Sequence, residues 1–552
     1  MDDFIWWRDG VIYQIYPRSF SDSNGDGLGD LPGVIARLDY LADLGVDAVW
    51  LSPFYPSPDK DFGYDVSNYV DVDPRFGTLA DFDRLVAEAH ARGIRVILDL
   101  VLNHTSDRHP WFLESRSSRD NPKADWYIWR PPSGSPHFLR KWGERQRGVP
   151  NNWQAALGEP AWGWVEERGQ FYHFSFLREE PDVNWRNPEV HAALMDVVRF
   201  WLERGADGFR LDIFNVFFKD AQFRDNPPTF GLRAYDRQKH VYDMDQPEMF
   251  PLLQEFRTLL DTYEDRYSVG EPLFAPPEMT ARYCGPDKLH AAFNFDFTIC
   301  RFDPRQVLRA ILNWERAAGT EVWPNYVLGN HDIIRPATRF AEGFLGAERM
   351  FIAQLPSGRL EDDSRAKVLM ALLLTLRGTP FIYNGDEIGM RELFLTHKEI
   401  MDPQGKIYWP LVRGRDGCRT PMQWDASANA GFSTARPWVR IHPDYRTRNV
   451  KAQRADPDSL LNLTRALISL RKEKRALRRG RFVPVTPQPR GALVYRRELQ
   501  GEKPILVALN FSRRALRLET PGRWNTLFGP APAEVRERCE LGAYEAMLFE
   551  SL

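Results

Sequence analysis

The sequence predicts an α/β protein built on a (β/α)8 TIM barrel, with an inserted subdomain after the third strand and a C-terminal antiparallel β domain. Three observations lead to this prediction. Short apolar runs alternate with amphipathic stretches along most of the chain. There are eight such apolar runs before the C-terminal segment. The alternation is interrupted in two places.

Eight short apolar runs are expected to form the strands of the barrel. The stretches 33–44 and 79–92, which separate the first three runs, have the apolar period of helices. Eight parallel strands joined by helices favour closure into a barrel, in which the chemistry takes place on the loops after the carboxyl ends of the strands. The predicted strands are 11–16, 48–51, 96–102, 208–213, 267–271, 291–297, 326–328 and 380–383.

Two stretches interrupt the alternation and define the other domains. Residues 103–176 are rich in Trp, Pro, Arg and Ser and have no helical period, so we expect them to form a subdomain above the barrel. The last part of the chain has the short alternating runs of an antiparallel sheet. We therefore predict barrel segments over 1–102 and 177–479, an inserted subdomain over 103–176 and a β domain over 480–552.

Composition excludes several classes of protein. A net charge of −3 over 552 residues gives no electrostatic reason to bind nucleic acid or an anionic membrane. The N-terminus is acidic where a signal peptide is basic, and no apolar run has the length of a membrane span. The four cysteines are scattered and suggest neither a zinc site nor a redox motif. We expect a cytoplasmic monomer or homo-oligomer without an organic cofactor.

Polar clusters with a carboxylate fall at the ends of several predicted strands. They contain Asp99, Asp212, Glu271 and Asp332, at the ends of the third, fourth, fifth and seventh strands. One carboxylate there could cap a helix or neutralise an arginine. Because a buried carboxylate is costly without a partner, four at the same edge of a barrel indicate an active site.

Two acids without a nucleophilic Ser or Cys motif suggest glycoside hydrolysis, in which one carboxylate attacks the sugar and the other transfers a proton. Arg210 lies two residues before Asp212 and therefore points to the same side of the strand. Its guanidinium would keep Asp212 ionised, as a nucleophile requires. Glu271 has no such neighbour in sequence and is the better candidate for a general acid with a raised pKa.

With these motifs the chain resembles the α-amylase superfamily (glycoside hydrolase family 13), in particular its α-glucosidase and oligo-1,6-glucosidase branch. The similarity covers almost the whole chain, and six motifs in the family's order make it specific. The motifs are Asp99…Asn103-His104, Gly208-Phe-Arg-Leu-Asp212, Gly270-Glu271, Asn330-His-Asp332, Pro181-Asp-Val-Asn184 and Arg419-Thr-Pro-Met-Gln-Trp424.

The resemblance implies a role for each matching catalytic residue. Asp212 would be the nucleophile and Glu271 the general acid and base. Asp332, the third catalytic carboxylate, would hydrogen-bond hydroxyl groups of the sugar in the first subsite and stabilise its distorted ring. His104 and His331 would bind the same sugar.

The resemblance also implies a pocket closed at one end. Arg210 would orient the nucleophile, while Asp61 and Arg415 would bridge and bind the 4-hydroxyl of the terminal glucose. Tyr64 would stack under this ring and Phe176 would form a wall of the pocket. Such a pocket separates an exo-acting enzyme from an endo-amylase. The alternatives are an ordinary surface ion pair for Asp61 and Arg415, and a core position for Phe176.

Side chains with oxygen atoms stand at 22, 24, 26 and 30, a spacing of every second residue broken only at Leu28, as in a loop that binds a hard cation. The pattern matches the start of an EF-hand, but Gly33 stands where that loop needs a bidentate Glu. The family resemblance implies a structural Ca²⁺ or Mg²⁺ instead, and the alternative is an Asx-rich turn without a metal. The implied ligands are Asp22, Asn24, Asp26, Asp30 and the carbonyl of Leu28.

We thus predict an exo-acting retaining α-glucosidase that hydrolyses terminal α-1,4 and/or α-1,6 bonds of short oligosaccharides or other small α-glucosides, with transglucosylation left open. The alternative is a glucosyltransferase or isomerase of the same family, such as a trehalose synthase or a sucrose-active enzyme. The Arg-Leu-Asp-Arg-Asp loop that resembles sucrose isomerases is absent from the sequence, which argues against that version. A non-catalytic relative is disfavoured because all three acids are present.

Ile213, directly after Asp212, is expected to continue the strand near the subsite of the leaving group. In similar enzymes Val at this position accompanies activity on α-1,6 bonds, and Thr or Ala accompanies a preference for α-1,4 bonds. Ile is β-branched and apolar, so its shape groups it with Val. The alternative is that Ile213 only packs inside the barrel.

Overall fold

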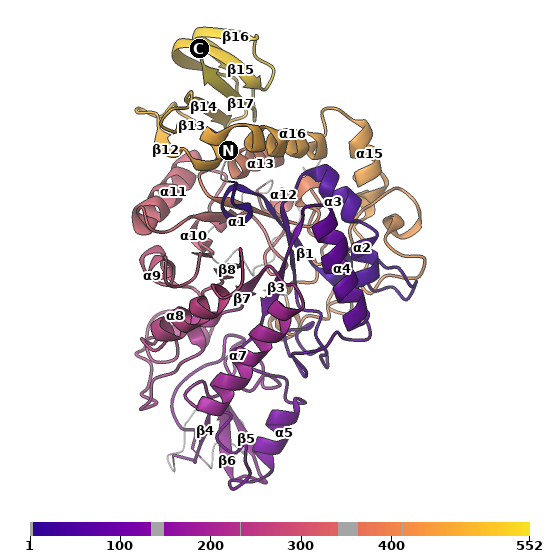
Figure 1. Ribbon diagram of the computed structural model, residues 1–552, viewed down its shortest axis with the longest axis vertical. Coiled ribbons are helices and arrows are strands. Elements are labelled where there is room, and N and C mark those ends of the chain that lie inside the picture. Colours follow the sequence, from indigo (N-terminus) through magenta and orange to yellow (C-terminus); the bar gives the residue numbers. More distant parts are fainter. Residues whose placement is uncertain (1–3, 134–147, 232, 341–362, 411) are drawn as a thin grey trace.

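Eight parallel strands form the central sheet of the protein (Figure 1). The computed structural model describes residues 4–133, 148–231, 233–340, 363–410 and 412–552. The strand order β10-β11-β1-β2-β3-β7-β8-β9 runs around a nearly closed barrel and confirms the predicted fold class. The strands are β1 (Ile12–Ile15), β2 (Ala48–Leu51), β3 (Arg95–Leu100), β7 (Gly208–Leu211), β8 (Tyr267–Gly270), β9 (Ala291–Ala292), β10 (Asn325–Val327) and β11 (Thr379–Tyr383).

Apolar side chains fill the inside of the barrel. Ile12, Trp50, Ile97 and Phe381 come from four different strands and belong to one buried cluster. Most barrel strands are buried along their whole length, because helices cover their outer faces. Their sequences therefore read as continuous apolar runs, which is why they could be recognised from the sequence.

The helices surround the sheet (Figure 1), and several of them begin at a side chain that caps their first turn. Thr78 forms a capping box with Asp81 at the start of α4, and Asp303 caps α11. No helix in the described part of the chain is both long and apolar enough to cross a membrane. The α-helices are α1 (Trp6–Asp9), α2 (Leu31–Ile35), α3 (Leu38–Leu44), α4 (Leu79–Ala91), α5 (Pro110–Ser117), α7 (Pro188–Glu203), α8 (Met249–Leu260), α9 (Pro277–Arg282), α10 (Phe295–Thr298), α11 (Pro304–Ala318), α12 (Pro336–Arg339), α13 (Ser364–Thr375), α14 (Pro403–Tyr408), α15 (Val450–Ala455), α16 (Leu460–Glu473) and α17 (Arg475–Arg479).

The segment after β3 leaves the barrel and forms a small separate sheet. Strands β4 (Trp129–Arg130), β6 (Gln170–His173) and β5 (Trp162–Val165) lie in that order and are antiparallel. Figure 1 places this sheet and α5 at the end of the molecule opposite the C-terminal strands. The chain then passes along 174–182 and enters α7, so this loop reaches the barrel from the subdomain side.

The C-terminal part is a six-stranded antiparallel sheet that packs beside α11 and α13 (Figure 1). Tyr495 contributes to this packing, because its hydroxyl lies 2.5 Å from the hydroxyl of Thr375 in α13. The sheet order is β12 (Arg481–Pro484), β13 (Ala492–Glu498), β14 (Ile505–Asn510), β17 (Ala546–Ser551), β15 (Leu516–Phe528) and β16 (Glu534–Leu541).

Candidate active site

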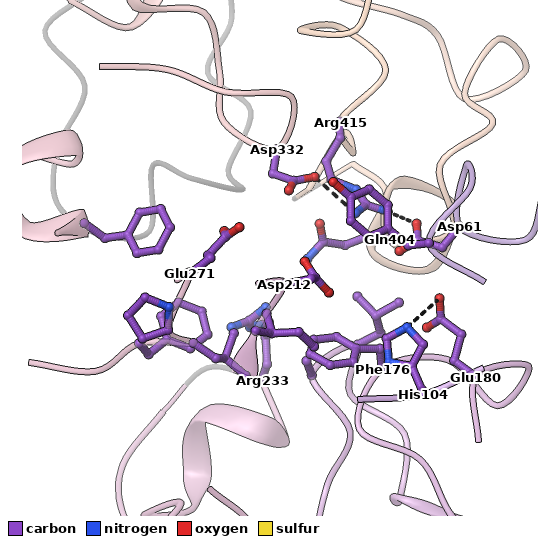
Figure 2. Close-up of a pocket in the computed structure, with 18 residues that line it drawn as sticks. Asp61, His104, Phe176, Glu180, Asp212, Arg233, Glu271, Asp332, Gln404 and Arg415 are labelled. Carbon is purple, nitrogen blue, oxygen red and sulfur yellow. Dashed lines mark hydrogen bonds and ion pairs between the residues drawn. The ribbon is translucent and has the colours of Figure 1, made fainter. Parts of the chain in front are cut away.

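A pocket of about 160 Å³ lies at the carboxyl ends of the barrel strands (Figure 2). Asp212 follows β7 directly and Glu271 follows β8 directly, so the end of each strand delivers one acid to the pocket. Arg210 and His331 lie beneath its wall. The other predicted catalytic and substrate-binding residues all line the pocket: Asp61, Tyr64, His104, Phe176, Asp212, Glu271, Asp332 and Arg415.

Arg210 connects three carboxylates beneath the pocket. One of its terminal nitrogens, Nη1, donates to Oδ1 of Asp99 and to Oδ1 of Asp212, both at 2.6 Å. The other terminal nitrogen, Nη2, contacts Oε2 of Glu271. From the sequence we expected a cation beside Asp212 and none beside Glu271. This expectation is wrong, because both acids contact the guanidinium of Arg210.

Burial sets the protonation of the nucleophile candidate. The pKa of Asp212 is raised because burial disfavours its charge, and Arg210 opposes this shift without cancelling it. Asp99 and Asp332 add repulsion in the same direction as burial. Burial together with repulsion from these two neighbouring carboxylates thus favours retention of a proton in the site, which acid catalysis requires.

Asp332 is held in the ionised form by its neighbours. Arg419 Nη2 lies 2.7 Å from Asp332 Oδ1, and His331 Nε2 lies 3.1 Å from Oδ2. Burial alone would raise the pKa of Asp332, but His331, Arg415 and Arg419 together bring it below its ordinary value. Asp332 is therefore a fixed negative charge facing the pocket.

His331 is engaged on both ring nitrogens. Nε2 lies 2.6 Å from the hydroxyl of Tyr64, and Nδ1 lies 2.7 Å from Nε2 of Gln14. The side chain is fully buried and does not line the pocket. His331 therefore holds Tyr64 and Asp332 in place from beneath the pocket, and its expected contact with the sugar stays a prediction.

Arg415 and Asp61 meet at one side of the pocket, as the pairing proposed from the sequence requires (Figure 2). Arg415 also donates to Asp402 at 2.6 Å and to Asp332 at 3.3 Å. The side chains of Arg415 and Asp61 are each only 14% exposed, so the alternative of an ordinary surface ion pair does not apply. A charged bridge thus forms part of the pocket wall beside Asp332.

Phe176 and His104 form another wall. Their ring centroids lie 5.7 Å apart, and both side chains line the pocket. Phe176 also packs against the apolar group that contains Ile213. The two interpretations of Phe176, as a core residue and as a pocket wall, are therefore both correct for this side chain.

Ile213 corrects the expectation that β7 continues past Asp212. The strand ends at Leu211, and Ile213 has φ +34° and ψ +40° immediately before the short 3-10 helix Phe214–Val216. A β-branched residue at positive φ is strained, because its side chain crowds the backbone. The sharp turn places Ile213 on the pocket wall while Asp212 faces the acids.

Ten further residues line the pocket besides the predicted catalytic and substrate-binding ones, and of these only Ile213 was expected near the site from the sequence. Glu180 directly precedes the Pro181–Asn184 motif, and this position was the one local signal that could have identified it. Ile213 and Pro272 directly follow the two catalytic acids, Phe295 and Gln404 lie in α10 and α14, and the rest come from loops without a motif. The ten are Ala156, Leu157, Glu180, Ile213, Arg233, Pro272, Leu273, Phe274, Phe295 and Gln404.

The acidic loop at 22–30 folds around its own backbone. Asp22 accepts hydrogen bonds from the backbone nitrogens of Asn24, Gly25 and Gly27 at 2.7–3.0 Å. All the predicted ligand atoms are oxygens, which are the ligands that a hard cation such as Ca²⁺ or Mg²⁺ prefers. Among the described residues, however, no three His, Cys, Asp or Glu side chains converge as a ready metal site. The cation therefore stays a prediction.

The sequence and the structure both match known sugar-converting enzymes. Residues 14–480 match the family model of the alpha amylase catalytic domain. A probable alpha-glucosidase of Rhizobium meliloti (strain 1021) is 44% identical, covering 94% of this chain and 92% of its own. An oligo-1,6-glucosidase of Parageobacillus thermoglucosidasius is 37% identical, with coverages of 92% and 91%.

The similar solved structures include enzymes that are named for activities other than hydrolysis. The alpha-glucosyl transfer enzyme XgtA has a TM-score of 0.90 and 40% identity over the full length of both chains. The trehalulose synthase MutB of Pseudomonas mesoacidophila MX-45 has a TM-score of 0.86 and 34% identity over 99% of each chain. With the barrel, the acids at its strand ends and these matches, the chain belongs to the α-amylase family of glycoside hydrolases, in its α-glucosidase and oligo-1,6-glucosidase branch.

Proposed function

We propose that this enzyme is an exo-acting retaining α-glucosidase that removes terminal glucose from small α-glucosides linked α-1,4 and/or α-1,6. The observation that carries the proposal is the Arg415–Asp61 bridge beside Asp332. A charged bridge in the pocket wall leaves room for the end of a sugar chain and obstructs its passage through the site. The same bridge offers several hydrogen-bond partners to the terminal glucose.

The proposed reaction is a double displacement. A carboxylate oxygen of Asp212 attacks the anomeric carbon while Glu271 donates a proton to the glycosidic oxygen, so the leaving alcohol departs neutral. Glu271, now ionised, removes a proton from water, and the water oxygen displaces Asp212 from the anomeric carbon. Two inversions give net retention. Arg210 contacts both acids and can balance the charge that passes between them.

A second candidate is glucosyl transfer to an alcohol other than water. The names of two structural relatives, an alpha-glucosyl transfer enzyme and a trehalulose synthase, favour it. Apolar pocket residues such as Leu273, Phe274 and Phe295 offer a surface on which an acceptor could exclude water. The lack of the Arg-Leu-Asp-Arg-Asp loop still argues against sucrose isomerisation.

The exo-acting mode is tested by the order in which products form from maltotetraose. We expect glucose and maltotriose as the first products. Maltose, which an internal cut of maltotetraose would produce, should not form early. Asp61→Ala and Arg415→Ala should each lower kcat/KM by about 10- to 100-fold, because a charged hydrogen bond to the sugar is lost. Arg465→Ala removes an exposed ion pair with Asp43 and serves as the control. Early production of maltose would contradict the proposal.

A further inference from the structure

Glu180 and His104 face each other on one side of the pocket (Figure 2). The residues are 0% and 2% exposed. Glu180 Oε1 and His104 Nε2 lie 3.7 Å apart, which is too long for a hydrogen bond, and each lacks a hydrogen-bond partner among the described residues. Two unsatisfied buried polar atoms in one pocket wall are costly unless a ligand completes them.

The proton of His104 is placed by a chain of hydrogen bonds behind the pocket. Lys219 Nζ donates to Oδ1 of Asn103 at 3.0 Å, which fixes the orientation of the Asn103 amide. The Asn103 Nδ2 group therefore donates to Asp182 at 3.1 Å and to His104 Nδ1 at 3.2 Å. Burial lowers the pKa of His104 to about 4, so the ring is neutral near pH 7. Its single N–H is then on Nε2, which faces Glu180.

The carboxyl group of Glu180 is held by a tight turn. Leu177 N donates to Glu180 Oε2 at 3.0 Å, and Glu180 N donates to Leu177 O at 2.9 Å. Oε2 is thus occupied, and Oε1 is the atom left for the pocket. Burial raises the pKa of Glu180, with repulsion from Asp61 and Asp65 acting in the same direction. Oε1 remains useful in either state, because it accepts a hydrogen bond when ionised and donates one when protonated.

We propose that Glu180 is a specificity-determining residue, which together with His104 binds one hydroxyl group of the terminal glucose. The hydroxyl oxygen accepts the N–H of His104 Nε2 and forms a second hydrogen bond with Glu180 Oε1. A hydroxyl suits this position because it can both accept and donate. The inference rests on the proposed α-glucosidase function and extends it to a residue that the sequence motifs did not identify.

Substrates that lack single hydroxyl groups provide the test. The wild type, Glu180→Ala, Glu180→Gln and the control Glu179→Gln are compared on p-nitrophenyl α-glucoside and its 3-, 4- and 6-deoxy analogues. We expect Glu180→Ala to lower kcat/KM on the parent sugar by about 10- to 100-fold. On one analogue, the one without the recognised hydroxyl, the wild type and Glu180→Ala should be nearly equal. On the other two the difference should persist.

The remaining variants separate binding from folding. Glu180→Gln keeps the volume of the side chain and can keep the hydrogen bond from Leu177, so it should recover most of the activity on the parent sugar. Glu179→Gln should match the wild type, because Glu179 does not line the pocket. In a protein that already carries His104→Ala, adding Glu180→Ala should lower kcat/KM by less than about threefold, because the two side chains bind the same hydroxyl.

Two results would overturn the inference. One is an equal loss for Glu180→Ala on all four sugars, which would indicate a structural role. The other is full activity of Glu180→Ala on the parent sugar. Thermal melting of each variant checks that the fold is intact. A wild-type enzyme inactive on every α-glucoside would instead overturn the proposed function, and this inference with it.

Discussion

The rings of Tyr64 and His331 are stacked with an interplanar angle of 3° and their centroids 5.4 Å apart. The Tyr64 hydroxyl also lies 2.6 Å from His331 Nε2, while Gln14 in β1 contacts the opposite ring nitrogen. Three segments that follow or belong to different strands therefore hold one tyrosine in place. Tyr64 lines the pocket and its hydroxyl reaches Asp99 at 3.2 Å, so this stack links the pocket wall to the buried acid cluster.

The stack predicts different effects for two substitutions of Tyr64. Tyr64→Phe keeps the ring and removes the hydrogen bond, so kcat/KM should fall by about tenfold. Tyr64→Ala also removes the aromatic face, and the loss should reach about 100-fold or more. Steady-state kinetics on maltose measures both, with the half-buried Tyr263→Phe as the control. Equal losses for the two Tyr64 variants would show that the ring itself contributes nothing.

The two proposed catalytic acids should be indispensable. Asp212→Asn and Glu271→Gln should each lower turnover by at least about a thousandfold, because each removes a step of the double displacement. Azide should partly restore Glu271→Ala, and the first sugar product should be the α-anomer by proton NMR. The exposed Glu278→Gln is the control. A β-anomer as first product would contradict the retaining mechanism.

The raised pKa of Asp212 predicts how activity depends on pH. Because burial favours its protonated form, the ionised nucleophile is lost as the pH falls through this raised value. The acid limb of kcat/KM should therefore lie above about 4, the ordinary value for an aspartate. A limb at or below that value would show that Arg210 outweighs burial.

The same shift has a consequence for stability. A carboxyl whose pKa is raised by folding binds its proton more tightly in the folded state, so the free energy of unfolding falls as the pH rises from the ordinary pKa to the raised one, and the loss is complete above the raised value. Asp212→Asn removes this penalty. We expect it to raise the melting temperature more at pH 8 than at pH 4, which calorimetry at both pH values measures. An increase independent of pH would assign the effect to packing.

The acidic loop predicts a structural role for a cation. Adding Ca²⁺ to chelator-treated enzyme should raise the melting temperature by several degrees, because an ion that binds only the folded state stabilises it. Mg²⁺ should act in the same direction, and turnover of the folded enzyme should hardly change. Asp26→Ala should lose the Ca²⁺-dependent increase. Loss of activity on chelation without any change in melting would rule out a structural ion.

Ile213 predicts the linkage preference. We expect isomaltose to be cleaved at a rate at least comparable to maltose, and Ile213→Thr to shift the ratio of kcat/KM toward maltose. Wall contacts of this kind discriminate by about 1–3 kcal/mol, so the shift should be about 10- to 100-fold or less. Ile213→Val keeps the β-branched apolar shape and should leave the ratio unchanged. An unchanged ratio in Ile213→Thr would remove Ile213 from specificity.

Local pattern was enough to predict the barrel and the positions of its acids. A buried parallel strand must be apolar along its length, so segments such as Ala48–Leu51 and Gly208–Leu211 are recognisable without their partners. Once eight such strands are joined by helices, their carboxyl ends meet at one face. Asp212 and Glu271 each follow a strand directly, and this placement depended only on short-range sequence.

Only the tertiary structure decided which side chains contact the acids and which other residues form the pocket. Arg415 and Asp61 are 354 residues apart, and Glu180 reaches the pocket from a loop that enters from the subdomain side. The contact of Arg210 with Glu271 depends on the packing of neighbouring strands, and the positive φ of Ile213 depends on the turn after β7. Periodicity follows from burial within one element, whereas these contacts follow from loop conformations that distant parts of the chain impose.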